Sequence, residues 1–518
     1  MKNIIKLFTF AALILSLVTI FSCTKDFEKI NTDNDLPGIK QAAPSMLLTG
    51  AIESMTNRVH EIFLGHEMGS CWVQQMAKIQ YTDEDRYIFR PGVVNNTWRS
   101  FYAASGEDVV TIYNIGNKNY KGVALVLKCY IGSVLTDLFG PVPYTNAWQG
   151  STSLLPSYDT QESIYRLMIA QLDSANTFFL DVNGLPIAGD ILYNNNILQW
   201  KQFANSLRLR LLLRMSAKDV GFVTTEMGKM INDPATYPLF GSSADNASLI
   251  YLGSFPNNNP INENRKTRDD HRVSKNLIDL LKDKYNDYRI MVFANPASAT
   301  DEFVGLPNGL LSADAVAYLG NGLTETCKMG DYFVQATSPG PLMNYAELQF
   351  ILAEAAVKGY IPGGIAQAKV YYDAGIAGSF NQYSTALQNI FTPNWGGAFG
   401  SLPIDSGYTV AAEISKQIDS TSSAAYFDVA ASNASLLQII AEQRYIANFD
   451  LGLEAWFEWR RTGFPVLIPA VAGANEGKIP IRVPYPSDEA ATNPTQMAAG
   501  VALLGGADGL NTPVWWDN

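Results

Sequence analysis

The chain has 518 residues, of which 47% are hydrophobic, and it carries 37 basic against 49 acidic side chains. This acidic balance excludes a typical nucleic-acid-binding protein, because phosphate contacts need clustered Lys and Arg. The large apolar share predicts a globular protein with a large core, and no stretch after the N-terminus looks long and apolar enough to span a membrane. Only four cysteines occur, far apart, so no disulfide framework is expected.

The N-terminus reads as a secretory signal. An apolar run from Ile4 to Phe21 ends at Ser22 and Cys23. Together with Ile20, these two residues resemble a bacterial lipobox, in which the cysteine becomes the lipidated first residue. Residues 1–22 are therefore expected to be a lipoprotein signal peptide, with Cys23 as the lipidation site. Ordinary secretion and an uncleaved anchor are the alternatives.

Polar and acidic residues follow the cysteine, and residues 23–38 are expected to form a lipidated tether. The acids just after Cys23 resemble the signal that exports some lipoproteins to the outer face of the outer membrane. Loss of Lys2 and Lys6 with the signal lowers the formal net charge from −12 to −14. No composition break divides residues 39–518, which we expect to form a single domain.

Helical periodicity recurs along this domain, and strand alternation is rare. The predicted helices cover residues 163–179, 200–211, 274–283, 345–355, 366–379 and 435–448. Short Gly- and Pro-rich turns such as residues 358–364 join neighbours, which favours tetratricopeptide-like helix pairs that share a core. Between the helices lie long irregular passages at residues 251–270, 295–340, 391–419 and 470–518. Loops of this length usually carry function.

Metal and cofactor sites are not indicated. His60 and His66 are six residues apart, which on a helix places them about 120° from one another. His271 is the only other histidine. The alternating polar residues at 31–35 lack the glycine and the final glutamate of a calcium loop. Residues 473–478 are one residue too short for a phosphate loop, so we predict no cofactor.

Glu347 and Glu354 lie seven residues apart on an otherwise apolar helix. Two carboxylates could act as general acid and general base, as in glycosidases. A helix that is apolar nearly all round is buried, however, and buried acids need partners. We therefore expect them to pair with arginines, and we predict that the chain is not an enzyme. The candidate partners are Arg208, Arg210, Arg214, Arg460 and Arg461.

Aromatic residues stand among polar or glycine neighbours in several predicted loops. Flat rings beside polar side chains suit a ligand with apolar faces and hydroxyl edges, such as a sugar, and also suit an extended peptide. The alternative is that these rings only fasten loops to the scaffold. The candidate ligand-binding residues are Tyr81, Arg86, Tyr87, Trp98, Trp395 and Phe399.

Several segments, in order, resemble the SusD/RagB-type outer-membrane lipoproteins of the Bacteroidetes. The first contains Thr136-Asp137-Leu138-Phe139-Gly140-Pro141-Val142-Pro143-Tyr144, and the helix after Trp200 reads Phe203-Ala204-Asn205-Ser206-Leu207-Arg208-Leu209-Arg210. The matching segments are Leu135–Tyr144, Pro156–Tyr165, Trp200–Arg210, Ala346–Ala355 and Glu454–Pro465.

This resemblance implies a mostly all-α fold in which tetratricopeptide-like helix pairs form a right-handed scaffold with long irregular ligand-binding loops. It implies a lipid-anchored, cell-surface protein that binds nutrient oligosaccharides and serves a SusC-like TonB-dependent outer-membrane barrel as a hinged lid. Peptides are the alternative cargo, and a surface polysaccharide hydrolase is a third hypothesis. The matching motifs lie mainly in scaffold helices, so the resemblance transfers no ligand-binding residue.

Overall fold

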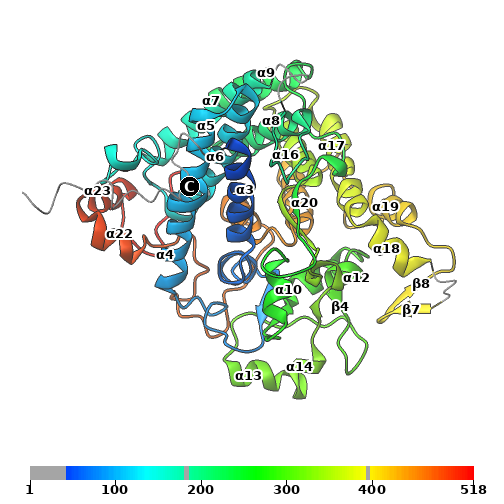
Figure 1. The fold of residues 1–518 in the computed structure, drawn as a ribbon. Helices are drawn as coiled ribbons and strands as arrows, with labels where there is room; N and C mark the ends of the chain where they lie inside the picture. The colour runs from blue at the N-terminus through cyan, green and yellow to red at the C-terminus, as the bar shows by residue number, and fades with distance from the viewer. Residues whose placement is uncertain (1–42, 180–185, 393–396, 518) are drawn as a thin grey trace, which may run out of the picture. The chain divides into compact units, whose positions relative to one another are not determined.

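The computed structural model describes residues 43–179, 186–392 and 397–517. The predicted signal peptide, Cys23, the tether and Trp395 lie outside these residues. The described chain from Pro44 onward forms one compact unit, which is mostly helical (Figure 1).

Long helices build most of this unit. They are α3 (Pro44–His60), α4 (Pro91–Arg99), α5 (Glu107–Ile115), α6 (Lys118–Phe139), α7 (Gln161–Phe178), α8 (Ile197–Arg214), α9 (Val220–Asn232), α16 (Tyr345–Val357), α17 (Gly364–Gln382), α18 (Ser384–Phe391), α19 (Val410–Ile418), α20 (Asn433–Ala447), α21 (Gly452–Thr462) and α23 (Pro494–Leu504).

Shorter helices interrupt the connections. They are α10 (Pro260–Arg265), α11 (Lys275–Asp279), α12 (Ile290–Phe293), α13 (Ser312–Ala317), α14 (Gly322–Glu325), α15 (Asp331–Val334) and α22 (Ser487–Thr492). Three π-helical segments (Ile62–Ser70, Ser100–Gly106, Leu280–Lys284) and three 3-10 turns (Gly150–Thr152, Ser243–Asp245, Tyr318–Gly320) complete the helical structure of the described residues.

The strands are short and pair only in twos, all antiparallel. The pairs are β1 (Met76–Lys78) with β3 (His271–Val273), β2 (Ala247–Ile250) with β6 (Pro339–Met343), β4 (Ala294–Asn295) with β5 (Lys328–Met329), and β7 (Gly397–Phe399) with β8 (Leu402–Ile404).

Consecutive helices pack side by side, as the sequence predicts. Contacts join α5 with α6, α6 with α7, α7 with α8, and α16 with α17. Polar side chains cap the starts of several of these helices; for example, Asn117 accepts from Asn119 N and Thr160 from Ser163 N. All six helices predicted from periodicity are present, although the segment after Ser274 splits into α11 and a π-helical turn.

Two glycines allow α16 and α17 to approach closely. A Cβ atom at Gly375 would lie 2.8 Å from the ring of Phe350, and one at Gly378 would lie 2.7 Å from the ring of Tyr345. Larger side chains at either position would push the helices apart. The turn that joins the pair starts α17 after Gly363, whose φ of 102° favours glycine.

Helix α6 is a feature that the sequence analysis missed. It is long and apolar enough to cross a membrane by length and composition alone, but 94% of its most apolar window is buried. It therefore serves as a central core helix that packs against α5, α7 and α8. Cys71, Cys129 and Cys327 are free and buried, as expected for small apolar side chains.

The passages predicted to be irregular are only partly so. Helix α19 lies within residues 391–419, and α22 and α23 lie within 470–518. The prediction of continuous loops there is wrong, because helices form where a cap or a proline starts them. Thr409 caps α19 through Ala412 N, and Pro494 opens α23.

Candidate functional site

Three segments that lie far apart in the sequence form one loop surface, which we call the loop platform: residues 79–88, 308–312 and 468–474. Backbone hydrogen bonds interlock them. These bonds run from Val471 N to Asn308 O (3.2 Å), from Ala472 N to Gly309 O (2.8 Å), and from Ala474 N to Arg86 O (2.7 Å). The platform is thus a fixed surface that brings together three of the six predicted ligand residues.

Asp85 joins two segments of the platform through hydrogen bonds to its carboxylate. Its fully buried carboxylate accepts hydrogen bonds from Lys78 N (3.1 Å), Asn308 Nδ2 (2.7 Å) and Gly309 N (2.9 Å). Burial raises its pKa to about 6 despite these donors. The carboxylate ties the first platform segment to the second.

Tyr81 is the predicted ligand residue that the platform presents most openly. Its side chain is 58% exposed. The guanidinium of Arg268 lies 4.8 Å from the ring centroid and covers one face. The φ of 50° at Tyr81 is in the left-handed region, which is strained for an aromatic residue. An exposed ring held in a strained position is a frequent feature of binding sites.

Arg86 and Tyr87 hold the platform together. Arg86 Nε donates to Ala472 O (3.0 Å), while its Nη1 lies 3.9 Å from Asp83. The ring of Tyr87 is buried, and its hydroxyl accepts from Ala470 N (2.9 Å). Burial raises the pKa of this hydroxyl. Of this pair, only Arg86 reaches solvent, so the two residues fasten the loops as the alternative interpretation expects.

Trp98 lies on α4 within an aromatic cluster, not in a loop. Its side chain is 9% exposed, and four rings surround it. They belong to Tyr102 (centroids 4.7 Å apart), Phe139 (5.2 Å), Tyr158 (6.3 Å) and Tyr485 (6.4 Å). The position on a loop expected for Trp98 is therefore wrong, because the flanking residues 91–99 form a helix that buries it.

Phe399 lies on β7, and its ring packs beside Phe303 with centroids 6.2 Å apart. Figure 1 shows β7 and β8 on the opposite side of the molecule from α4, so Phe399 and Trp98 do not share one site. Trp395 falls outside the described residues. The ligand-binding role of all six candidates remains a prediction.

Three exposed aliphatic residues, two on the platform and one beside it, escaped the sequence analysis. Val466, Ile468 and Val471 are 71%, 77% and 71% exposed. The sequence analysis placed only Val471 in an irregular passage and made no prediction for the other two. Clustered exposed apolar side chains are typical of binding surfaces.

An open cleft of about 520 Å³ lies between the end of α17, α18 and α19. Amide and hydroxyl side chains line much of it: Asn381, Ser384, Thr385, Gln388 and Asn389. These groups can donate to and accept from hydroxyls. The cleft offers no exposed aromatic ring among its lining residues, in contrast to the platform.

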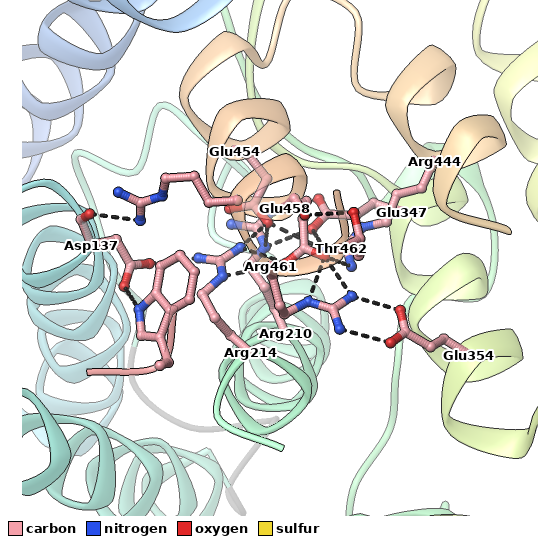
Figure 2. A network of polar contacts seen from close by, with 12 residues as sticks. Asp137, Arg210, Arg214, Glu347, Glu354, Arg444, Glu454, Glu458, Arg461 and Thr462 are labelled. Carbon is pink, nitrogen blue, oxygen red and sulfur yellow. Dashed lines mark hydrogen bonds and ion pairs between the residues drawn. The ribbon is translucent and has the colours of Figure 1, made fainter. Parts of the chain in front are cut away.

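The carboxylates considered for catalysis are structural. Figure 2 shows Glu347 and Glu354 pointing into a buried ionic network. Arg210 Nε donates to Glu347 Oε1 (2.7 Å), and Arg444 Nη2 donates to the same oxygen (2.9 Å). Arg461 makes a two-bond contact with Glu354, at 2.7 and 2.6 Å. The prediction that arginines pair with both acids is confirmed.

The electrostatics of these acids fit salt-bridged carboxylates. Burial alone would raise the pKa of Glu354, but the charges of Arg461 and Lys358 lower it to about 2. Arg210 and Arg444 likewise lower the pKa of Glu347 against the effect of burial. A general acid needs the opposite shift.

The network extends to α6 and α20, which the sequence analysis did not connect, and to two further acids on α21. Arg214 Nη1 donates to Asp137 (2.6 Å) on α6, and Arg214 Nη2 donates to Glu458 (3.0 Å) on α21 and also contacts Glu454. Arg444 Nη1 on α20 donates to Glu458 (2.6 Å). Only the tertiary fold reveals these partners (Figure 2).

The histidines, which looked unrelated in the sequence, have separate partners, and two of them lie near acids. His66 Nε2 lies 3.6 Å from Asp450 and His271 Nε2 lies 3.4 Å from Glu67. His60 Nε2 contacts Pro341 O at 2.7 Å. Within the described residues, no three metal-ligating side chains form a group that could hold a metal ion.

A family model named SusD-like and described as starch-binding and associating with the outer membrane matches residues 36–486. The chain belongs to the SusD-like family. A search of curated proteins gives no match.

Solved structures resemble this SusD-like chain over most of its length. A chitin-binding protein is 25% identical with a TM-score of 0.76, over 92% of this chain and all of that chain. A chitin-binding SusD homolog from Flavobacterium johnsoniae is 26% identical with a TM-score of 0.75, over 91% and 98%. A SusD homolog from Bacteroides fragilis is 25% identical with a TM-score of 0.72, over 92% and 100%.

These findings confirm the family and the helical fold that the resemblance implied. The family description and the names of these structures are those of binding proteins and not of enzymes, in agreement with the prediction. The loop platform is a candidate binding surface of this SusD-like chain.

Proposed function

We propose that this SusD-like protein binds nutrient oligosaccharides at the cell surface and delivers them to a SusC-like TonB-dependent outer-membrane transporter. The family description as starch-binding and associating with the outer membrane supports a glycan ligand and this location. Two of the similar structures are named chitin-binding. The lipid on Cys23 would anchor the protein in the membrane, with residues 24–38 as a tether.

The single observation that supports a ligand site on the platform is the exposed ring of Tyr81 beside the guanidinium of Arg268. A sugar ring can stack on the open face, while its hydroxyls accept from the guanidinium group of Arg268. The backbone bonds that interlock the platform hold these groups in place before the ligand arrives. Such preorganisation lowers the entropic cost of binding.

Peptide cargo is the second candidate. Val466, Ile468 and Val471 offer exposed aliphatic surface next to Tyr81's loop. Aliphatic side chains suit apolar peptide residues better than they suit hydroxyl-rich sugars. The same platform would then bind extended peptides for the same transporter.

A binding array separates these candidates. The mature protein is applied to chito-oligosaccharides, malto-oligosaccharides, other plant and microbial glycans, and a peptide pool. We expect binding to a glycan class. Binding to peptides alone would identify peptides as the cargo. No binding to any glycan or peptide would reject a ligand site that is complete in the isolated protein.

The anchor and the transporter have separate tests. A Cys23→Ala variant should lose membrane association and incorporation of radiolabelled palmitate. A SusC-like barrel should co-purify with the tagged lipoprotein from its native membrane, and failure to recover any barrel after crosslinking would reject the partnership.

A further inference from the structure

One stripe of helix α6 carries cations without acidic partners. Lys118, Lys121 and Lys128 follow one another at spacings of three and seven residues, with Leu125 between them, so they share a face. None of the three forms an ion pair within the described residues. By contrast, the described arginines all lie in ion pairs.

Lys128 lines a groove of about 280 Å³ between α5, α6 and α7. The other lining residues are Val109, Val110, Tyr113, Ala124, Leu125, Gln171, Ser174 and Phe178. The walls are mainly apolar, and the rings of Tyr113 and Phe178 meet edge to face with centroids 6.4 Å apart. A groove of this size holds one or two side chains.

The ammonium of Lys128 is only partly solvated. Its Nζ lies 4.8 Å from the ring centroid of Tyr144 and 5.4 Å from that of Trp148. Burial lowers the pKa of Lys128. The nearby acid Asp159 is already occupied by Thr145 Oγ1 (2.7 Å) and by two backbone amides. Aromatic faces offset less of the desolvation cost of a cation than a carboxylate does.

A second donor stands beside this cation. Tyr144 OH donates to Gln171 Oε1 (2.6 Å), which fixes the orientation of the amide. The Nε2 group of Gln171 has no acceptor among the described residues, and Gln171 and Lys128 line the same groove. Two fixed donors without an acceptor are suited to a carboxylate.

We propose that this groove docks an acidic segment of a protein partner, with an apolar side chain against Val110, Tyr113 and Phe178 and a carboxylate at Lys128 and Gln171. The stripe from Lys118 to Lys128 extends about 15 Å along α6, which matches a polypeptide with several acids. A sugar acid is the less suitable ligand, because few hydrogen-bonding groups line the walls. The proposal is independent of the cargo bound at the platform.

The test uses the mature protein and an array of acetylated hexapeptides that combine Asp or Glu with Phe, Leu or Tyr. Matched peptides carry Asn or Gln in place of the acids, and oligogalacturonate serves as the rival ligand. Binding is measured by fluorescence polarisation at low salt and at 0.5 M NaCl. We expect acidic peptides to bind at low salt and their amide counterparts to bind much more weakly.

Variants locate the binding. Lys128→Met should weaken it by about tenfold or more, and Val110→Asp should abolish it by placing a like charge in the groove. Lys218→Met removes an exposed lysine that also lacks an ion pair, and it should leave binding unchanged. Since Lys128 forms no ion pair, Lys128→Met should keep the melting temperature of the wild type. If it is destabilised instead, Val110→Asp still tests binding in the groove.

Three outcomes would overturn the proposal. The first is an array in which acidic peptides bind no better than the amide controls. The second is peptide binding that survives both Lys128→Met and Val110→Asp. The third is Lys128-dependent binding of oligogalacturonate without peptide binding, which would make the groove an acidic-glycan site.

Discussion

Arg210 and Glu347 form a two-bond ion pair inside the helical scaffold, with Nε to Oε1 at 2.7 Å and Nη2 to Oε2 at 2.5 Å. Neither side chain is more than 3% exposed. Arg444 shares the same carboxylate, so two helices that precede and follow α16 converge on it. Such pairs make the scaffold sensitive to the loss of any one member.

Replacing Glu347 with Gln should lower the free energy of unfolding by about 3–5 kcal/mol, because two buried guanidinium groups, Arg210 and Arg444, each lose one of their counter-charges. Urea denaturation, monitored by circular dichroism, measures this loss. Glu162→Gln breaks the exposed pair with Arg166 and should cost less than about 1 kcal/mol. Equal effects for the two variants would contradict the structural importance of the network.

Acid should destabilise the protein partly through Glu354. Its pKa is about 2 in the folded chain against an ordinary value of 4.5, so its contribution is present above pH 4.5 and is lost as the pH falls toward 2. The shift corresponds to about 3 kcal/mol. Unfolding free energies measured between pH 3 and 6 should fall less steeply with acid in Glu354→Gln. An unchanged slope would show that Glu354 is not salt-bridged in solution.

Tyr81→Ala should weaken binding of the glycan identified on the array by about tenfold, or ~1.4 kcal/mol, since it removes the exposed ring of the platform. Its melting temperature should stay nearly constant because the side chain is 58% exposed. Isothermal titration calorimetry gives the affinity. Tyr360→Ala, on the turn between α16 and α17, is the matched aromatic control and should bind normally. Unchanged affinity in Tyr81→Ala would move the site away from this part of the platform.

Trp98→Ala should cost about 3–5 kcal/mol of stability, because it empties the centre of a cluster of five rings. Thermal unfolding measures the loss. The affinity of the fraction that remains folded decides whether Trp98 also contacts ligand. A stable variant with weakened binding would support the ligand role predicted from the sequence over the packing role.

The helices were predictable because their signals are local. The spacing of Trp200, Phe203, Leu207 and Leu211 is enough to predict α8, and no distant residue is needed. The exposure of Tyr81 among polar neighbours was predictable in the same way. Paired charges on α16 could be inferred from the cost of burying acids, although Arg444 could not be chosen from the sequence.

The burial of loop aromatics could not be predicted, because distant segments decide it. Tyr87 has polar neighbours, yet its hydroxyl is bound by Ala470 N, 383 residues away. The ring of Trp98 is covered in part by Tyr485. Likewise, residues 468–474 join the platform only through tertiary hydrogen bonds. Local composition describes each segment but not which segments meet.

The order of the network residues along the chain has a consequence for biosynthesis. Arg214 lies 240 residues before Glu454 and 244 before Glu458. A chain still emerging from an export channel would hold Arg214 and Arg444 without two of their counter-charges, Glu454 and Glu458, until α21 arrives. Burial of these cations before then is unfavourable. The scaffold is therefore expected to fold late, in one cooperative step. A chain truncated before Gly452 should stay unfolded and be degraded by proteases during export.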